Sequence, residues 1–360
     1  MTFYNRRTFI KIGGLGILGS ILYAINRFRS RRHGSYYDKK KNDEKYGKDL
    51  SHEEIDNKIH KSSDDLSDQV LSIPRRMLGN TGVPVSILGL GGAGIIAQEG
   101  QEAKEATKKI VKLAFDKGIN YIDTAPTYGV SESNLGNAIA NLNIDRTQLF
   151  IATKTLSRSY SETKQLLEQS LDRLQTDYID LYQIHGINDQ QDLQDIISED
   201  GPLRAIDELK QEGKIKYTGI TGHREPEVLE SALDIFDFDC LLMPLNAGDV
   251  HYKPFQTELL SKANDKGVGV IAMKVMAYGN IFADIGISSA SQALNYTCSF
   301  PISTAIIGFS DIKELEENIS VVEDFRSLET DELREMEELT AHYYNDINHF
   351  RSWYCLFNGG

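Results

Sequence analysis

Three ionisable residues of the sequence share a regular spacing and a common position, the end of a short apolar run. Asp123, Lys154 and His185 follow one another at intervals of 31 residues, and Tyr128 lies five residues after Asp123. Each interval is the length of one strand–helix unit. Strands repeated at this spacing would bring the ends of three neighbouring strands, and these side chains with them, to one place.

This set of side chains suits the reduction of a carbonyl group. A hydride delivered to a C=O leaves an alkoxide that needs a proton, and the phenol of Tyr128 can supply it as a general acid. An unperturbed phenol has a pKa of about 10, so a nearby cation such as Lys154 is needed to stabilise the phenolate. Asp123 would keep Lys154 charged and oriented, and His185 would polarise the substrate carbonyl.

The elements that must position these residues alternate between strand and helix patterns. Helical spacing of apolar residues marks the intervening stretches, such as 103–117 and 161–174. Eight strands, each followed by a helix, predict an α/β fold, a (β/α)8 TIM barrel in which the carboxyl ends of the strands surround one site. Eight β-branched apolar runs are read as strands, at 86–90, 119–123, 149–154, 178–185, 215–221, 238–243, 268–274 and 304–308.

Two glycine-containing segments bear on this prediction. Residues 76–86 look like two short strands around a glycine turn, an N-terminal β-hairpin before the barrel. Residues 88–94 (LGLGGAG) contain four glycines, which leaves a doubly wound sheet as the alternative. No helix opens directly on these glycines, so we interpret them as backbone that permits close approach at a barrel mouth.

One phrase of the sequence is similar to a known family. Residues 121–129 (YIDTAPTYG), with Ser131-Glu132 and Leu135-Gly136, resemble the aldo-keto reductases, and Asp123, Tyr128, Lys154 and His185 match the catalytic tetrad of that family in order and context. The resemblance runs from about Arg76 to Glu323. It implies a barrel that binds NADP or NAD and an NAD(P)-dependent oxidoreductase acting on a small aldehyde or ketone.

The resemblance also implies a cofactor site, with departures from the family pattern. Thr221 keeps the hydroxyl of a Ser-Asn pair, and Gly222 replaces its asparagine. Met273 stands in place of a ring-stacking tyrosine, and Lys274 stands where the pyrophosphate is contacted. The other implied cofactor contacts are Gly92, Asp123, Asn246, Gly308, Ser310, Glu317 and Asn318.

Glu314 bears on the choice between the two cofactors. Many members of the family have an arginine at this position against the 2′-phosphate of NADP. A carboxylate there would repel that phosphate and can accept a hydrogen bond from a free ribose hydroxyl. NADP is the family default, and Glu314 makes that preference doubtful. His223 receives no role and is interpreted as a surface or capping histidine.

The chain is expected to have four parts. Residues 1–34 form a leader, 35–72 a charged linker that cannot offset its ordering entropy, 73–326 the barrel, and 327–360 a C-terminal helix and aromatic tail. The helix is expected near 331–343. The aromatic residues after it either line the substrate mouth or cover apolar barrel surface, and the sequence leaves both open.

The leader resembles a twin-arginine export signal. Residues 5–11 (NRRTFIK) precede the apolar stretch 12–25, which as a helix is about 21 Å long against a hydrocarbon core of about 30 Å. No clear cleavage site follows, so two outcomes are open: use by the export machinery, or persistence as a membrane tether. A cytoplasmic location is the alternative.

Charge and cysteine content exclude several classes of protein. The 360 residues carry a net charge of −14, divided as +7 over 1–32, −3 over 33–74 and −18 over the rest, so a nucleic-acid partner is not expected. Cys240, Cys298 and Cys355 lack the spacing of a metal site, and we expect buried hydrophobes and no metal. The alternative function is a nicotinamide-binding regulatory or redox-sensing subunit tethered to a membrane partner.

Overall fold

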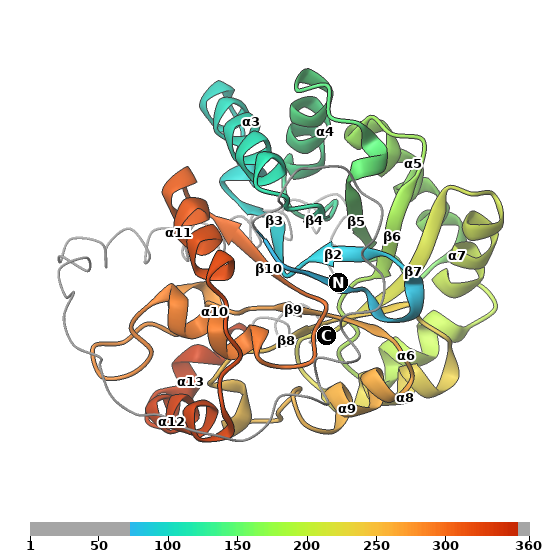
Figure 1. Ribbon diagram of the computed structural model, residues 1–360. Helices are drawn as coiled ribbons and strands as arrows, with labels where there is room; N and C mark the ends of the chain where they lie inside the picture. Colours follow the sequence, from blue (N-terminus) through green and yellow to red (C-terminus); the bar gives the residue numbers. More distant parts are fainter. Residues whose placement is uncertain (1–72, 352–360) are drawn as a thin grey trace, which may run out of the picture. The chain divides into compact units, whose positions relative to one another are not determined.

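Eight parallel strands close into a barrel in the computed structural model, which describes residues 73–351 (Figure 1). Closure occurs where β10 pairs with β3, with Ala305 opposite Leu88 and Gly308 opposite Gly91. The prediction of a (β/α)8 barrel is confirmed, and the doubly wound alternative is wrong. The strands are β3 (Leu88–Gly94), β4 (Tyr121–Asp123), β5 (Phe150–Thr155), β6 (Ile179–Ile184), β7 (Ile215–Thr221), β8 (Cys240–Pro244), β9 (Gly269–Met273) and β10 (Thr304–Phe309).

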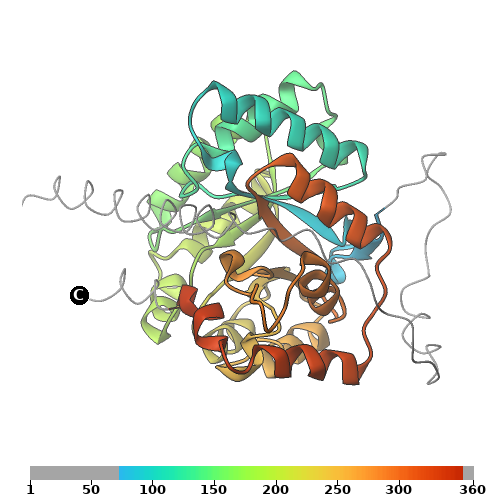
Figure 2. The same cartoon turned by 90° about the vertical axis from the view of Figure 1, so that its left-hand side faces the viewer.

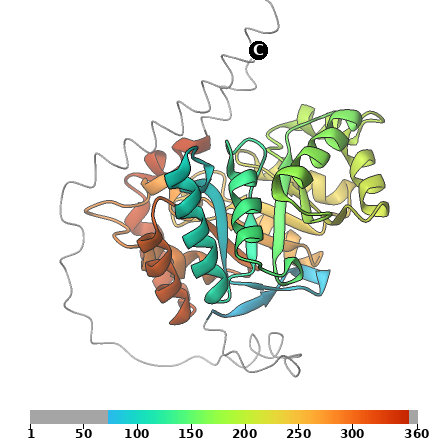
Figure 3. The same cartoon turned by 90° about the horizontal axis from the view of Figure 1, so that it is seen from above.

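Helices surround the strands of the barrel (Figures 2 and 3). In α5 the residues that are buried share one face of the helix, because their spacing follows the helical period. They are Thr163, Leu167, Ser170, Leu171 and Leu174. The helices are α3 (Gln101–Asp116), α4 (Ser131–Asn141), α5 (Tyr160–Leu174), α6 (Gln190–Ile197), α7 (Pro202–Gln211), α8 (Pro226–Ile235), α9 (Glu258–Asp265), α10 (Ala290–Cys298), α11 (Ile312–Glu323), α12 (Thr330–Thr340) and α13 (Tyr344–Ile347).

The predicted β-hairpin is present and closes the amino-terminal end of the barrel. Strands β1 (Arg75–Met77) and β2 (Pro84–Ser86) pair antiparallel. Buried Leu78 and Val85 of the hairpin segment join an apolar cluster that contains Tyr121 and other residues of the barrel strands. Apolar burial therefore fills this end of the barrel and leaves the opposite end for polar chemistry.

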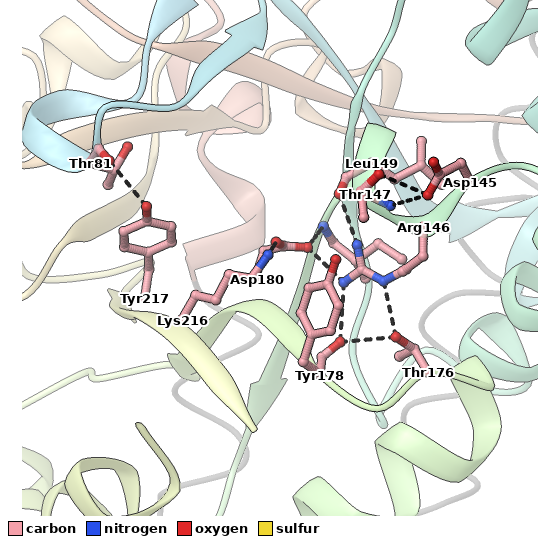
Figure 4. A network of polar contacts seen from close by, with 11 residues as sticks. Thr81, Asp145, Arg146, Thr147, Leu149, Thr176, Tyr178, Asp180, Lys216 and Tyr217 are labelled. Carbon is pink, nitrogen blue, oxygen red and sulfur yellow. Dashed lines mark hydrogen bonds and ion pairs between the residues drawn. The ribbon is translucent and has the colours of Figure 1, made fainter. Parts of the chain in front are cut away.

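A network of charged residues reinforces the same end (Figure 4). Asp180, near the start of β6, accepts hydrogen bonds from Arg146 (2.6 Å), from Lys216 (3.0 Å) and from the backbone N–H of Ile151 (2.9 Å). The ring of Tyr178 lies 4.3 Å from the Arg146 guanidinium and 3.9 Å from the Lys216 ammonium. These contacts join β5, β6 and β7 at their amino-terminal ends, where barrel residues serve stability.

The C-terminal part follows α11 and packs on the barrel. The helix expected near 331–343 is α12, and α13 follows it. Ile347 and Phe350 are buried, so this part of the tail covers apolar surface. The leader, the linker and the tail residues 352–360 lie outside the described residues, and the predictions made for them stay predictions.

Two further findings concern the described range only. No helix within residues 73–351 is long and apolar enough to cross a membrane. Cys240 and Cys298 are free and buried, as expected, while Cys355 lies beyond the described range.

Candidate active site

The four residues that carry the predicted chemistry lie at the carboxyl ends of three adjacent strands. Asp123 is the last residue of β4, Lys154 lies next to the end of β5, and His185 directly follows β6. Strand β5 pairs with both β4 and β6. Tyr128 lies in the loop after β4. The regular spacing in the sequence therefore corresponds to neighbouring positions in the barrel.

Asp123 and Lys154 form a buried ion pair. The Lys154 Nζ lies 2.5 Å from Asp123 Oδ1, and each side chain is 1% exposed. The same ammonium donates to the carbonyl of Thr124 (2.9 Å), and Gln183 donates to the other oxygen of Asp123 (3.1 Å). Burial raises the pKa of Asp123 and lowers the pKa of Lys154, while the charge of each partner opposes both shifts. Each group therefore depends on the other to stay charged.

Tyr128 lies between this cation and an imidazole. Its ring centroid is 4.9 Å from Lys154 Nζ and 6.2 Å from the centroid of the His185 ring, with the two rings nearly perpendicular at 84°. The phenol is half-buried. A cation next to a phenol stabilises the phenolate, so this arrangement can support proton donation.

His185 is buried, and its imidazole is held neutral. Burial, followed by the charges of Lys154, Lys274 and Arg158, lowers its pKa well below the usual value. Its Nδ1 atom has no hydrogen-bond partner within the described part of the chain. A neutral imidazole has one N–H to donate. The ring can thus present a hydrogen bond to a substrate oxygen.

The two glycines of the expected cofactor site lie where backbones approach closely. A Cβ atom on Gly92 would lie 2.5 Å from the Ser131 hydroxyl and 2.9 Å from the Asp123 carbonyl. A Cβ atom on Gly308 would lie 3.0 Å from the carbonyl of Ala93. The end of β3 therefore needs glycine to let β4 and β10 approach, which agrees with the interpretation of the glycine-rich segment.

The end of β7 explains one departure from the family pattern. The Thr221 hydroxyl accepts a hydrogen bond from the N–H of Gly186 at 2.9 Å, which leaves its proton available to donate. A Cβ atom on Gly222 would lie 2.7 Å from the Ile187 carbonyl and 2.9 Å from Leu229. An asparagine at position 222 therefore does not fit without a shift of its surroundings.

Asn246 braces the loops that follow β8 and β9, here named the β8 loop (residues 245–257) and the β9 loop (residues 274–289). Its side-chain amide donates to the Lys274 carbonyl (3.1 Å), and its side-chain oxygen accepts from the N–H of Gly248 (2.9 Å). Both ends of the amide are thus used by the chain itself. Direct contact of Asn246 with a cofactor stays a prediction.

Met273 and Lys274 are neighbours with different surroundings. Met273 is buried at the end of β9 with the barrel-interior cluster. Lys274 adopts a left-handed backbone conformation with φ of 60°. Its ammonium donates to the Tyr278 hydroxyl at 2.5 Å and lies 4.1 Å from that ring. A methionine surface and a cation thus stand side by side at the barrel mouth.

The start of α11 is capped by acidic side chains. Asp311 accepts from the N–H groups of Lys313 (3.0 Å) and Glu314 (3.1 Å), and Glu314 accepts from the N–H of Ser310 (2.7 Å). Free N–H groups at a helix N-terminus attract phosphate, but here Asp311 accepts from two of them and Glu314 accepts from the N–H just before the helix. Of the two residues expected near adenine, Glu317 is exposed.

Asn318, the other residue expected near adenine, is buried. Its Oδ1 atom has no hydrogen-bond partner within residues 73–351. A buried amide oxygen without a partner is costly, so a donor from a bound ligand would satisfy it.

The comparison with known families decides the identity. The sequence pattern described as "Aldo/keto reductase family" matches residues 87–283, which is more than half of the chain. The chain belongs to the aldo/keto reductase family. It is an aldo-keto reductase, an oxidoreductase of a family that uses NAD(P)H.

Three relatives illustrate the range of this aldo-keto reductase's similarity. L-galactose dehydrogenase of Arabidopsis thaliana is 32% identical over 302 residues, which cover 72% of this chain and 91% of that protein. A putative voltage-gated potassium channel subunit beta of Schizosaccharomyces pombe is 27% identical over 333 residues, which cover 75% of this chain and 94% of that protein. The solved holo form of aldo-keto reductase AKR11C1 from Bacillus halodurans has a TM-score of 0.62 and 27% identity, and the match covers 74% of this chain and 96% of that chain.

The residues of this aldo-keto reductase fit a nicotinamide dinucleotide. Gly92 and Gly308 allow close approach of neighbouring chain at the ends of β3 and β10, and Asn318 has an unsatisfied buried amide oxygen. Lys274 adds a cation at the mouth. A cation suits a pyrophosphate, and an amide oxygen without a partner suits the amino group of an adenine.

One residue near the tetrad of this aldo-keto reductase was misjudged from the sequence. His223 is 2% exposed, and its ring centroid lies 6.2 Å from that of His185. The interpretation as a surface histidine is wrong, because the side chain is buried and its ring lies beside that of His185. A signal was available, since His223 follows the end of a barrel strand by two residues, as Asp123, Lys154 and His185 mark the ends of theirs.

Proposed function

We propose that this aldo-keto reductase reduces the carbonyl of a small aldehyde or ketone to an alcohol, with Tyr128 as the general acid. The observation that carries the proposal is the position of Lys154. Its ammonium pairs with Asp123 at 2.5 Å and lies 4.9 Å from the Tyr128 ring. A cation held in this way lowers the cost of forming phenolate, and that cost is the main obstacle to proton donation by tyrosine.

The protein residues then divide the work between binding and proton transfer. A bound reduced nicotinamide supplies the hydride. His185, kept neutral by burial, donates a hydrogen bond to the carbonyl oxygen and orients it toward Tyr128. The phenol gives its proton to the oxygen as the alkoxide forms, and Lys154 stabilises the phenolate that remains. Gln183 and the Thr124 carbonyl keep Asp123 and Lys154 in place.

We further propose that the cofactor lies across the ends of β7 to β10 and the start of α11. Thr221, Met273 and Lys274 would hold its nicotinamide and pyrophosphate, with Asn246 bracing the same loops. Gly308, Ser310, Glu317 and Asn318 would hold its adenosine part. Glu314 and Asp311 place negative charge where a 2′-phosphate would bind, and this favours NAD over NADP.

The first experiment measures turnover by the purified full chain. With NADH or NADPH and a broad panel of carbonyl compounds, absorbance at 340 nm should fall. Tyr128→Phe should reduce this rate by about 10²–10⁴-fold, because the proton donor is lost. Tyr217→Phe is the matched control, since its hydroxyl donates to Thr81 at the opposite end of the barrel (3.1 Å). Full turnover by Tyr128→Phe would contradict the mechanism.

A regulatory role is the second candidate, favoured by the similarity to the putative potassium channel subunit beta. In that role the barrel would bind the cofactor tightly and act on a membrane partner, with negligible turnover. Cofactor binding without loss of absorbance at 340 nm for any carbonyl, together with a co-purified membrane protein, would favour it. The presence of all four tetrad residues favours the enzymatic function over the regulatory one.

We also propose that residues 1–34 direct the chain to the twin-arginine export route or tether it to the membrane. The proposal is supported by the basic and apolar order of that segment alone. Because the route carries folded proteins, the barrel would travel with its cofactor already bound. Protease treatment of intact cells tests the location, because digestion of the barrel would exclude the cytoplasmic alternative.

A further inference from the structure

The C-terminal segment, residues 330–351, holds both loops that flank the expected nicotinamide site (Figure 1). The Thr340 hydroxyl donates to the Ala247 carbonyl in the β8 loop at 2.8 Å. The Tyr343 hydroxyl donates to the Ile281 carbonyl in the β9 loop at 2.8 Å. The two loops are therefore joined to one segment far along the chain.

The strongest of these contacts is a buried ion pair. Arg351 Nη2 donates to Asp249 Oδ1 at 2.9 Å, and the two side chains are 6% and 0% exposed. The same guanidinium donates to the Lys253 carbonyl at 2.9 Å. A carboxylate taken out of water is costly unless a cation and hydrogen bonds compensate it. The conformation of the β8 loop around Asp249 thus depends on Arg351.

A chain of hydrogen bonds connects this pair to the site. Asp249 Oδ2 accepts from the N–H of Asn246 (3.1 Å), and the Asn246 side chain donates to the Lys274 carbonyl (3.1 Å). Lys274 has a left-handed φ of 60°, a conformation that is unfavourable for a residue other than glycine and must be held by its surroundings. The hydrogen bond from Asn246 contributes to holding it.

We propose that the buried Arg351–Asp249 pair is a positioning device that sets the affinity for the nicotinamide cofactor, by holding Asn246 and Lys274 at the barrel mouth. The inference rests on the proposed function, because Lys274 contacts a cofactor only in a chain that binds one. The hydrogen bonds that connect Arg351 to the site lead through Asp249 to Asn246 and Lys274, which are not members of the tetrad. Its loss therefore weakens cofactor binding more than it slows the chemical step.

The test compares cofactor binding in the full chain before and after Arg351→Met. Dissociation constants for NADH and NADPH are measured by the fluorescence of the bound reduced nicotinamide. We expect Arg351→Met to raise the dissociation constant of the preferred cofactor about tenfold or more, as the loss of a buried charged hydrogen bond implies. At saturating cofactor, turnover should stay within about threefold of the unchanged chain.

Arg146→Met is the matched control, because the barrel has a second Arg–Asp pair at its other end (Figure 4). Arg146 Nη2 lies 2.6 Å from Asp180, and no contact links this pair to the β8 or β9 loop in the described part of the chain. Arg146→Met should leave the cofactor dissociation constant within about twofold of the unchanged chain. An equal rise in both variants would show loss of general stability and overturn the inference.

The remaining outcomes are also decisive. An unchanged dissociation constant in Arg351→Met overturns the inference and leaves the proposed function intact. An unaltered chain that binds neither NADH nor NADPH contradicts both. If Arg351→Met does not yield folded protein, Arg351→Lys decides, because lysine keeps the charge and loses the fork of donors. A rise of about threefold or more in the cofactor dissociation constant of Arg351→Lys then supports the inference, and an unchanged constant overturns it.

Discussion

At the scale of single residues, the site depends on groups whose charge states are set by burial. Asp123 and Lys154 are both buried and keep their charges through contact with each other. His185 lies next to this pair and is driven to the neutral form by burial and by nearby cations. One ion pair and one neutral imidazole therefore surround Tyr128. This combination suits a site that donates a proton and a hydrogen bond to the same oxygen.

The neutral state of His185 predicts a pH dependence of stability. In the unfolded chain the imidazole binds a proton below pH 6.5, whereas in the folded chain its pKa is well below that value. The unfolded state then binds more protons, so the free energy of unfolding falls as the pH falls. Between pH 6.5 and 5.5, the free energy of unfolding of His185→Gln should fall by about 1 kcal/mol less than that of the unchanged chain.

Denaturant titrations at pH 7.5, 6.5 and 5.5 check this prediction. His342→Gln is the matched control, because it makes the same substitution at an exposed histidine. If His185→Gln and the unchanged chain lost stability in parallel over this range, His185 would bind a proton as readily in the folded chain as in the unfolded chain. The lowered pKa assigned to its buried imidazole would then be wrong.

At the scale of elements, α11 has an N-terminus that its own acids neutralise. Asp311 and Glu314 accept from backbone N–H groups that would otherwise attract a phosphate. The acid Glu314 both fills this position with negative charge and blocks one donor, the N–H of Ser310. This arrangement is the basis of the proposed preference for a ribose with free hydroxyls.

Glu314→Arg should move the cofactor preference toward NADPH. The change removes a repulsive charge, frees the N–H of Ser310 and adds a cation that pairs with a 2′-phosphate. We expect the ratio of dissociation constants, NADH over NADPH, to rise about 10–100-fold. Glu316→Arg on the exposed side of the same helix makes the same change of charge and should shift the ratio little. A large shift of this ratio in both variants would show that the net charge of the helix, and not the position of Glu314, sets the cofactor preference.

At the scale of the whole barrel, stability and chemistry occupy opposite ends. The hairpin, the apolar cluster and the Asp180 network close the amino-terminal end, while the tetrad and the β8 and β9 loops lie at the other. The carboxyl ends of barrel strands are connected to variable loops, so residues there can change without loss of the closed sheet.

This division predicts that Arg146→Met destabilises the chain without changing catalysis. Asp180 is 6% exposed and would keep Lys216 as its partner, so we expect a loss of about 2 kcal/mol in the free energy of unfolding. Denaturant titration measures the loss, and the rate of carbonyl reduction per folded molecule should not change. A matched change at an exposed pair, Lys112→Met beside Asp116, should cost less than about 0.5 kcal/mol.

Much of the barrel and the position of the tetrad could be predicted from the sequence. The apolar runs predicted all eight strands to within a few residues, except that β3 continues to Gly94 instead of ending at Leu90. Strand and helix periods are local signals, and a parallel barrel brings successive strand ends together. Asp123, Lys154 and His185 therefore needed only their spacing to be placed on adjacent strands.

Tertiary structure alone decided the surroundings of that tetrad. The burial of His223, the bracing role of Asn246 and the Arg351–Asp249 pair depend on loops whose conformations no local pattern encodes. Asp249 and Arg351 are separated by 102 residues and meet because α12 and α13 return across the β8 loop. The sequence by itself determined which residues stand at the strand ends, since periodicity is local. Which charges are buried together was decided by long-range packing, since burial depends on every segment that covers a site.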